Sequence, residues 1–190
     1  MSDVPDSVAL DQFVAVRLEE TRSETLDHIG NEVTALFSEF RGRILRYLIC
    51  LGLSVQDSEE VVQEVFLLLY QHLRENRART NLRGWLFRVA HNLGLKKRMG
   101  TLRTNGQDSE YFLLATDAAP SPEEQVLMKQ QQKRLSAVLG ALPEQDRSCL
   151  YLRAEGLRYR EIAEVLSISL GSVAQSLARA VKRLNHVYQQ

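Results

Sequence analysis

The sequence predicts an all-α protein of two small helical domains joined by a flexible linker. Apolar residues recur at the three- and four-residue spacing of a helix face along most of the 190-residue chain. The period-2 alternation of a half-buried strand is absent from the sequence. A stretch that loses the helical spacing and ends in two prolines separates the helical patterns. We therefore expect four segments: an acidic N-terminal extension at 1–27, a domain at 28–98, a linker at 99–121 and a second domain at 122–190.

Three helices are predicted in the first domain. Apolar spacing places the first over about 28–50, and Gly52 ends it. Ser54 or Asp57 is the expected N-cap of the second helix. A polar, basic loop follows it, and a third amphipathic helix covers about 82–98. The expected core residues of this domain are Phe37, Leu45, Leu48, Val62, Phe66, Leu69, Trp85, Leu86 and Val89.

The second domain is predicted to begin with a helix capped by Ser121, with Pro122 at its first position. Residues 158–184 then hold two apolar helical patterns separated by the polar turn SISLG at 167–171. This is the layout of a helix-turn-helix, whose second helix enters the major groove of DNA. A helical hairpin without a DNA-binding role has the same pattern, but the flanking basic residues favour the DNA-binding version.

The formal net charge of zero conceals strong segregation of charge along the chain. Residues 1–39 carry a net charge of −7, and the rest of the chain carries +7. A block of −4 at 54–70 is followed by a block of +8 at 74–103. This segregation indicates two faces for two partners, with nucleic acid the candidate for the basic face.

No motif predicts a catalytic residue, a metal ligand or a cofactor site. Cys50 and Cys149 lack CxxC spacing, the four histidines are scattered, and phosphate-loop, hydrolase and metalloprotease motifs are absent. We therefore expect a protein that is not an enzyme and needs no cofactor. No apolar run reaches the roughly 18 residues that span a bilayer, and the N-terminus lacks the layout of a secretory signal. These features predict a cytoplasmic protein without membrane insertion.

Two segments resemble one protein family. Residues 142–184, LPEQDRSCLYLRAEGLRYREIAEVLSISLGSVAQSLARAVKRL, resemble region 4 of the sigma-70 family, in its extracytoplasmic-function (ECF) group. DSEEVVQEVFLLLYQHL at 57–73, followed by NLRGWLFRVAHNLGLKKR at 81–98, resembles region 2 of the same group. Order, spacing and length also match, over roughly 30–187. The resemblance implies a sigma factor that binds core RNA polymerase and directs promoter recognition and transcription initiation, with region 2 on the −10 element and region 4 on the −35 element.

The acidic helix of region 2 in this family binds coiled-coil helices of the polymerase's largest subunit. The matching positions here are Asp57, Glu60, Gln63 and Glu64. Residues 54–70 contain no Lys or Arg, which suits a basic partner surface. An acidic helix face that is merely solvated has the same pattern.

The basic helix of region 2 and its preceding loop contact the −10 element in the family, partly as single-stranded DNA. Such binding needs cations for phosphates and flat groups for unstacked bases. Asn81 and Asn92 offer hydrogen bonds to base edges, and Trp85 either stacks on a base or packs in the core. The matching cations are Arg77, Arg79, Arg83, Arg88, Lys96, Lys97 and Arg98.

The recognition helix departs from the family pattern G-[ST]-V-[KR]-S-R-[LV]. Ala174 and Ser176 stand where relatives usually carry a cation, so −35 binding is expected to be weaker or differently specified. Both positions lie off the expected apolar stripe, so we expect them to face the groove and to accept Lys or Arg at little cost. The expected −35 contacts are Arg158, Arg160, Ser172, Gln175, Ser176, Arg179, Lys182 and Arg183.

Two other classes of function stay open from sequence. A helix-turn-helix regulator that binds duplex DNA without polymerase leaves the charged helices of 55–98 without a purpose. A sigma-like protein that acts mainly through protein–protein contacts is favoured by Ala174 and Ser176. The sequence does not decide whether an anti-sigma factor is a partner. It also leaves open whether residues 1–27 are disordered, a short helix or a regulatory segment.

Overall fold

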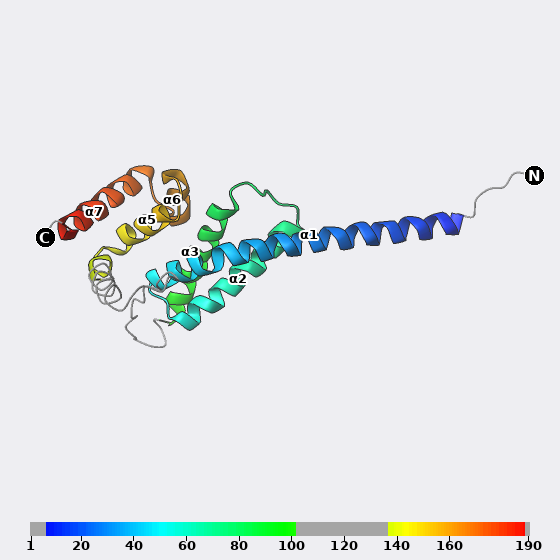
Figure 1. The fold of residues 1–190 in the computed structure, drawn as a ribbon, viewed down its shortest axis with the longest axis horizontal. Coiled ribbons are helices and arrows are strands. Elements are labelled where there is room, and N and C mark those ends of the chain that lie inside the picture. The colour runs from blue at the N-terminus through cyan, green and yellow to red at the C-terminus, as the bar shows by residue number, and fades with distance from the viewer. Residues whose placement is uncertain (1–6, 102–136, 189–190) are drawn as a thin grey trace, which may run out of the picture.

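The computed structural model describes residues 7–101 and 137–188, with side chains placed over 25–100 and 137–185. Within these ranges the chain forms helices, turns and loops and no strand, which confirms the all-α prediction (Figure 1). The helices are α1 (Ser7–Cys50), α2 (Val55–Arg74), α3 (Leu82–Thr101), α5 (Glu144–Ala154), α6 (Tyr159–Leu166) and α7 (Leu170–Tyr188). The helix start predicted at Ser121, and the predicted linker beyond Thr101, lie outside the described residues.

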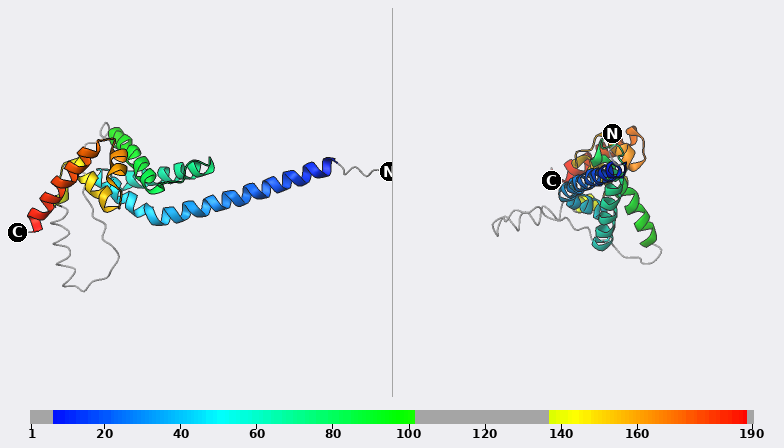
Figure 2. Two further views of the ribbon diagram at one scale, coloured as in Figure 1. Left: turned by 90° about the horizontal axis from the view of Figure 1, so that it is seen from above. Right: turned by 90° about the vertical axis from the view of Figure 1, so that its right-hand side faces the viewer.

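Helix α1 is far longer than the apolar pattern predicts. It begins at Ser7 rather than near residue 28, and its N-terminal part projects away from the other helices (Figures 1 and 2). Residues 7–29 contain no Gly or Pro, the residues that most strongly oppose a helix. The apolar pattern therefore marks where α1 begins to be buried, with Ile29 as the first buried side chain in the described range, and not where the helix begins.

Local chemistry sets the starts of α2 and α3. Gly52 turns the chain at φ +97°, and the Ser54 hydroxyl then caps α2 by accepting the Asp57 N–H at 3.0 Å, which makes Ser54 and not Asp57 the cap. Asn81 caps α3 in the same way, because its Oδ1 accepts the Gly84 N–H at 3.1 Å. A Cβ at Gly84 would lie 2.5 Å from Asn81 Nδ2, so a larger residue there would force the capping side chain of Asn81 to shift.

The C-terminal helices have the predicted helix-turn-helix layout. Glu161 accepts the Arg158 N–H at 2.6 Å at the start of α6. The turn uses Ser167 in the left-handed region at φ +54° and Ser169, whose hydroxyl accepts the Ser172 N–H at 3.1 Å. The apolar stripe of α7 is buried at Val173, Leu177 and Ala180, whereas Val181 is exposed.

One apolar core runs through both halves of the chain. Helices α1, α2 and α3 pack together, and α5 and α6 pack onto α1 and α3 (Figures 1 and 2). Most of the predicted core residues of the first domain are buried: Leu48, Val62, Phe66, Leu69 and Leu86. Three more are half-buried: Leu45, Trp85 and Val89. The prediction for Phe37 is wrong, because its ring lies at the rim of a pocket and is 36% exposed.

Two leucines on α2 provide a matched test of this packing. Leu69 is fully buried and Leu67 is 58% exposed. Leu69→Ala should lower the free energy of unfolding by about 2–5 kcal/mol, because it removes buried apolar contacts and leaves a cavity. Leu67→Ala should change it by less than about 0.5 kcal/mol. Urea unfolding followed by circular dichroism measures both, and equal losses would contradict the packing described.

Candidate functional site

The acidic face of α2 is exposed along most of its length. Glu60, Gln63 and Glu64 are open to solvent, and Asp57 is half-buried. Two of these carboxylates bind a cation of α3: Lys97 Nζ lies 2.5 Å from Glu60 Oε2 and 3.4 Å from Asp57 Oδ1. The hydrogen bonds to Glu60 and Asp57 raise the pKa of Lys97. The acidic face and the basic helix are therefore in direct contact.

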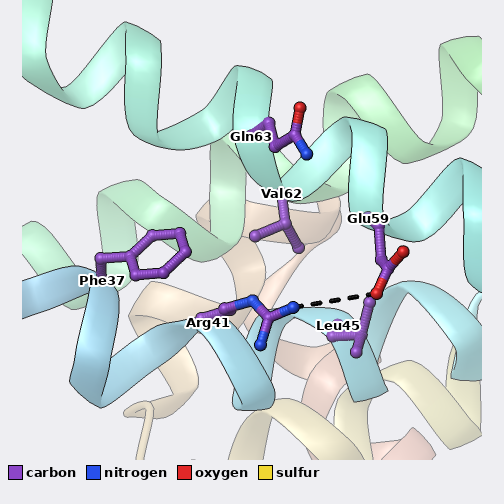
Figure 3. A pocket seen from close by; sticks show the side chains of 6 residues that line it. All are labelled: Phe37, Arg41, Leu45, Glu59, Val62 and Gln63. Carbon is purple, nitrogen blue, oxygen red and sulfur yellow. Dashed lines mark ion pairs between the residues drawn. The ribbon is translucent and has the colours of Figure 1, made fainter.

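A cavity of about 290 Å³ opens between α1 and α2 beside this acidic face (Figure 3). It is lined by Phe37, Arg41, Leu45, Glu59, Val62 and Gln63. Figure 3 shows the Arg41 guanidinium reaching toward Glu59 across the cavity, at 3.8 Å. Phe37 packs edge-on against Phe66, with ring centroids 4.9 Å apart, and the Arg41 guanidinium lies over the Phe37 ring, 5.9 Å from its centroid. This cavity is not predictable from the sequence, since a helical apolar pattern does not reveal which of its residues lie at a rim.

One stripe of α3 carries exposed polar residues at four-residue spacing. Arg88, Asn92 and Lys96 follow one another along one face of the helix, and all three are exposed. No ion pair to any of the three occurs within the part of the chain that the structure describes. These three residues form what we call the α3 stripe.

The other cations expected to meet −10 DNA are engaged with this chain. Arg77 pairs with Glu75 at 2.7 Å, and Arg79 pairs with Glu32 of α1 at 2.6 Å. Arg98 pairs with Glu144 of α5 at 2.9 Å. The Arg83 guanidinium lies against Gly156, where an added Cβ would be 3.0 Å from Arg83 Nη1.

Two of the expected base-contacting groups also have local roles. Asn81 is the N-cap of α3, so its side-chain oxygen is occupied. Trp85 is half-buried, and its ring packs against that of His72 with centroids 4.8 Å apart. Of the two alternatives left open for Trp85, the structure therefore favours packing.

The exposed face of α7 is largely neutral at its N-terminal end. Ala174, Gln175 and Lys182 are exposed, while Ser172 is half-buried and shares a hydrogen bond with Ser169. In the turn before α6 and at its start, Arg158 and Arg160 are also exposed.

The expectation for Ser176 is wrong, because this residue is fully buried. Position 176 is three residues after Val173 and four before Ala180, so it belongs to the inward-facing stripe of α7. Its hydroxyl accepts a hydrogen bond from Gln145 Nε2 at 2.9 Å and another from Arg179 Nη2 at 3.1 Å. A polar side chain at this position was mistaken for a groove-facing one.

The described residues hold no group of three or more His, Cys, Asp or Glu side chains that could bind a metal ion. Nor does any helix within the described ranges have the length and apolar content needed to cross a membrane.

Comparison with known proteins decides the family. Residues 36–99 match the family model "Sigma-70 region 2", and residues 132–184 match "Sigma-70, region 4". The chain belongs to the sigma-70 family. Its place in the ECF group follows from its relatives, several of which are ECF RNA polymerase sigma factors.

Two relatives and one solved structure illustrate the similarity. The probable RNA polymerase sigma factor RfaY of Xanthomonas campestris is 29% identical over 130 residues, and the match covers 66% of this chain but only 32% of that protein. The RNA polymerase sigma-H factor of Pseudomonas aeruginosa is 27% identical over 163 residues, covering 81% of this chain and 84% of that one. The structure of the sigma factor RpoE with the anti-sigma factor NepR from Bartonella quintana has the same fold, with a TM-score of 0.60 at 18% identity, covering 82% and 97% of the two chains.

An ion pair with a buried carboxylate joins α5 to α7 in region 4 of this sigma-70 family member. The carboxylate of Asp146 is 1% exposed and receives two bonds from Arg179, from Nε at 3.0 Å and from Nη2 at 2.6 Å. Hydrogen bonds from the Arg179 guanidinium hold the pKa of Asp146 below its ordinary value, although burial of the carboxyl group acts to raise it. The role of Asp146 is not apparent from the sequence, because an acidic residue in the first turn of a helix is favoured by the helix dipole alone. Arg179 remains half-exposed, so its outer side stays accessible.

A new cation should destabilise the fold at position 176 but not at position 174. Ser176→Arg should lower the free energy of unfolding by about 2–4 kcal/mol, because it forces a large charged group into a filled site. Ala174→Lys should stay within about 0.5 kcal/mol of the unmodified chain, since position 174 is exposed. Urea unfolding of the two variants tests this difference. Equal stability would contradict the placement of Ser176.

The Asp146–Arg179 pair should also affect how the free energy of unfolding depends on pH in acid. A carboxyl group with a lowered folded pKa stabilises the fold above its unfolded pKa, and this stabilisation is lost as pH falls toward the folded pKa. Asp146→Asn should therefore lower the free energy of unfolding near neutral pH. The further loss of stability as pH falls from about 5 to about 3 should be smaller in this variant than in the unmodified chain. Urea midpoints across that range measure it. The exposed Glu164→Gln serves as the control and should leave the decline unchanged.

Proposed function

We propose that this protein is a sigma factor that binds core RNA polymerase and directs promoter recognition and transcription initiation. In this role region 2 meets the −10 element and region 4 meets the −35 element. The observation that carries the proposal is the presence, in one chain, of an acidic helix face, a basic helix stripe and a helix-turn-helix in the order of the two matched sigma-70 regions. The protein then acts as an initiation factor, in the cytoplasm, where polymerase works.

The α2 face and its cavity suit polymerase docking. The exposed carboxylates of Glu60 and Glu64 favour a basic partner surface, and complementary charge speeds association and selects the partner. The adjoining cavity offers an apolar wall of Phe37 and Val62 where a partner side chain can be buried. Apolar anchors surrounded by charged rims are typical of protein–protein interfaces.

The α3 stripe suits the −10 element. Arg88 and Lys96 can neutralise phosphates, while Asn92 between them can donate to and accept from a base edge. The other cations proposed for this element are Arg77, Arg79, Lys97 and Arg98, which must first exchange their carboxylate partners for phosphate, and Arg83, which lies against Gly156. Exposed ion pairs contribute only about 0–1 kcal/mol, so this exchange is feasible for the exposed ones.

The exposed side chains of α7 in region 4 suit a −35 element that is contacted through few cations of the protein. Gln175 is the exposed side chain best placed to read a base edge, and Lys182 is an exposed phosphate contact. Arg179 adds a cation whose direction is fixed by Asp146. With Ala174 neutral and Ser176 buried, α7 offers fewer phosphate contacts than the family pattern.

An anti-sigma factor is a further partner that we propose. The support is the fold shared with the RpoE chain, whose solved structure contains the anti-sigma factor NepR. Within the described residues, the acidic α2 face and the cavity beside it offer a surface for such a protein.

Promoter-dependent run-off transcription with purified core polymerase tests the main proposal. The chain should co-purify with core polymerase and support initiation at a cognate promoter. A helix-turn-helix regulator would bind duplex DNA without co-purifying. A protein that acts only through protein contacts would co-purify without initiating, and either result would overturn the proposal.

Charge reversal at Glu64 should weaken polymerase binding about five- to tenfold, because it places a cation against a basic partner surface. Glu64 is a cleaner choice than Glu60, which pairs with Lys97. Glu164→Lys, at an exposed site on α6, is the charge-matched control and should bind as the unmodified chain does. Polymerase titration at two salt concentrations, with circular dichroism for helix content, gives the readout. Equal binding by the two variants would show that α2 is not the docking face.

A further inference from the structure

One exposed row of α7 combines a side chain for base edges with two cations. Gln175, Arg179 and Lys182 follow one another at spacings of four and three residues, so they share one face of the helix. All three are exposed, and we call them the α7 row. Lys182 has no ion pair within the part of the chain that the structure describes, whereas Arg179, the central member of the row, is bound to α5.

The Arg179 guanidinium is held along one edge only. Its Nε and Nη2 donate to the two oxygens of Asp146 at 3.0 and 2.6 Å, and Nη2 also donates to Ser176 at 3.1 Å. A guanidinium has five N–H donors in one rigid plane, so these bonds use the donors of Nε and Nη2. The two donors of Nη1 have no acceptor within the described residues, and 54% of the side chain is exposed. The free edge of the guanidinium is therefore available to a ligand.

The Asp146 carboxylate is the fixed member of this pair. Asp146 lies in the first turn of α5, its side chain is 1% exposed, and α5 packs on α7. Hydrogen bonds from Arg179 and Ser176 hold the pKa of Asp146 below its ordinary value, although burial acts to raise it, so the carboxylate stays charged. Because a buried charge requires its partner, the pair sets the direction of Arg179 and not that of Asp146.

The serine at position 176 keeps this carboxylate for Arg179. Ser176 is fully buried and also accepts a hydrogen bond from Gln145 Nε2 at 2.9 Å. The family pattern has a cation at this position, and an arginine here would compete with Arg179 for Asp146. The departure from the family pattern therefore does more than remove a cation, because it leaves a neighbouring cation with a defined orientation.

Orientation and charge act on DNA binding in opposite directions. Immobilising a long side chain at an interface costs roughly two- to tenfold in the binding constant, and Arg179 is already immobilised in the folded chain. By charge alone, however, Asp146 should weaken binding, because its carboxylate neutralises an arginine and repels a phosphate. The sign of the effect of removing this carboxylate shows which of the two dominates.

We propose that Asp146 is a positioning residue for the −35 contact of region 4: together with Ser176, it directs the Nη1 edge of Arg179 at a DNA phosphate, and this orientation outweighs the charge that it cancels. The inference deepens the proposed function and rests on it. Gln175 lies one turn before Arg179, so a fixed phosphate contact at Arg179 also sets the register in which Gln175 meets a base edge.

The test measures duplex DNA binding by the full chain without polymerase. Phosphate contacts do not depend on sequence, so a fluorescent duplex of mixed sequence serves as the probe, titrated from about 50 mM salt upward. Asp146→Asn should weaken binding about fivefold with an unchanged salt slope, because Arg179 keeps its charge but loses its orientation. Glu164→Gln removes the same charge from an exposed site on α6 and should bind no more weakly than the unmodified chain.

A lysine at position 179 should reverse the sign of the effect. The ammonium group of Arg179→Lys lacks the second edge of a guanidinium, so it cannot bind Asp146 and a phosphate in the same way. Adding Asp146→Asn to Arg179→Lys should free the lysine and tighten binding about two- to fivefold. Ser176→Ala changes no charge, removes one hydrogen bond to Arg179, and should weaken binding about twofold. Circular dichroism checks that each variant is folded.

Equal or tighter binding by Asp146→Asn would overturn the positioning role. A loss of the same size in the Arg179→Lys background would also overturn it, because Asp146 would then act only on the fold. No detectable binding by the unmodified chain at low salt would contradict the phosphate contact itself.

These outcomes are separate from those of transcription, since the assay contains no polymerase. A chain that shows the reversal of sign but never initiates transcription contradicts only the sigma assignment. A chain that initiates transcription without the reversal contradicts only the role of Asp146.

Discussion

The burial of Tyr47 is the interaction on which the rest of the structure depends. A large ring with a hydroxyl group enters the core only where aromatic neighbours and a hydrogen-bond partner are both present, since an unpaired buried hydroxyl costs about 1–3 kcal/mol. Phe87, Tyr151 and His91 meet these needs from α3 and α5. Burial raises the pKa of Tyr47 well above its ordinary value and lowers that of His91, so both groups stay neutral. One aromatic cluster thus sets how the α3 stripe and the helix-turn-helix lie relative to each other.

The charges of this sigma-70 family member serve two purposes, which the structure separates. Exposed pairs such as Lys97 with Glu60 contribute little to stability and can be exchanged for a phosphate or a polymerase side chain. The pair of Asp146 with Arg179 differs, because the carboxylate is 1% exposed and would be left as a buried charge without its partner. A net charge of zero is therefore compatible with the DNA-binding surface that we propose, since several of its cations pair with carboxylates of the same chain.

Features that depend on local chemistry could be predicted from the sequence, and features that depend on how helices meet could not. The Ser54 cap, the Gly52 turn and the helix-turn-helix follow from short-range rules and are confirmed. Ser176 and Phe37 were misplaced, because helical spacing leaves the edges of a buried stripe uncertain by one position. The engagement of Arg98 with Glu144 joins residues 46 positions apart, a contact that no periodicity reveals. The apolar core shared by the two halves was not predicted for the same reason, because each half has the sequence pattern of a complete helical unit.

The central claim, that buried Tyr47 joins the two matched regions into one folded unit, is tested most directly by the urea unfolding of Tyr47→Ala. Tyr47 packs on Phe87 of α3 and on Tyr151 of α5, so the unmodified chain should unfold in a single transition. Tyr47→Ala should lower the free energy of unfolding by about 3–5 kcal/mol and should separate the unfolding of the two regions into two transitions. Circular dichroism and the fluorescence of Trp85, which lies in region 2, follow the two transitions. A Tyr47→Ala variant that keeps one transition and loses less than about 1 kcal/mol would contradict the account.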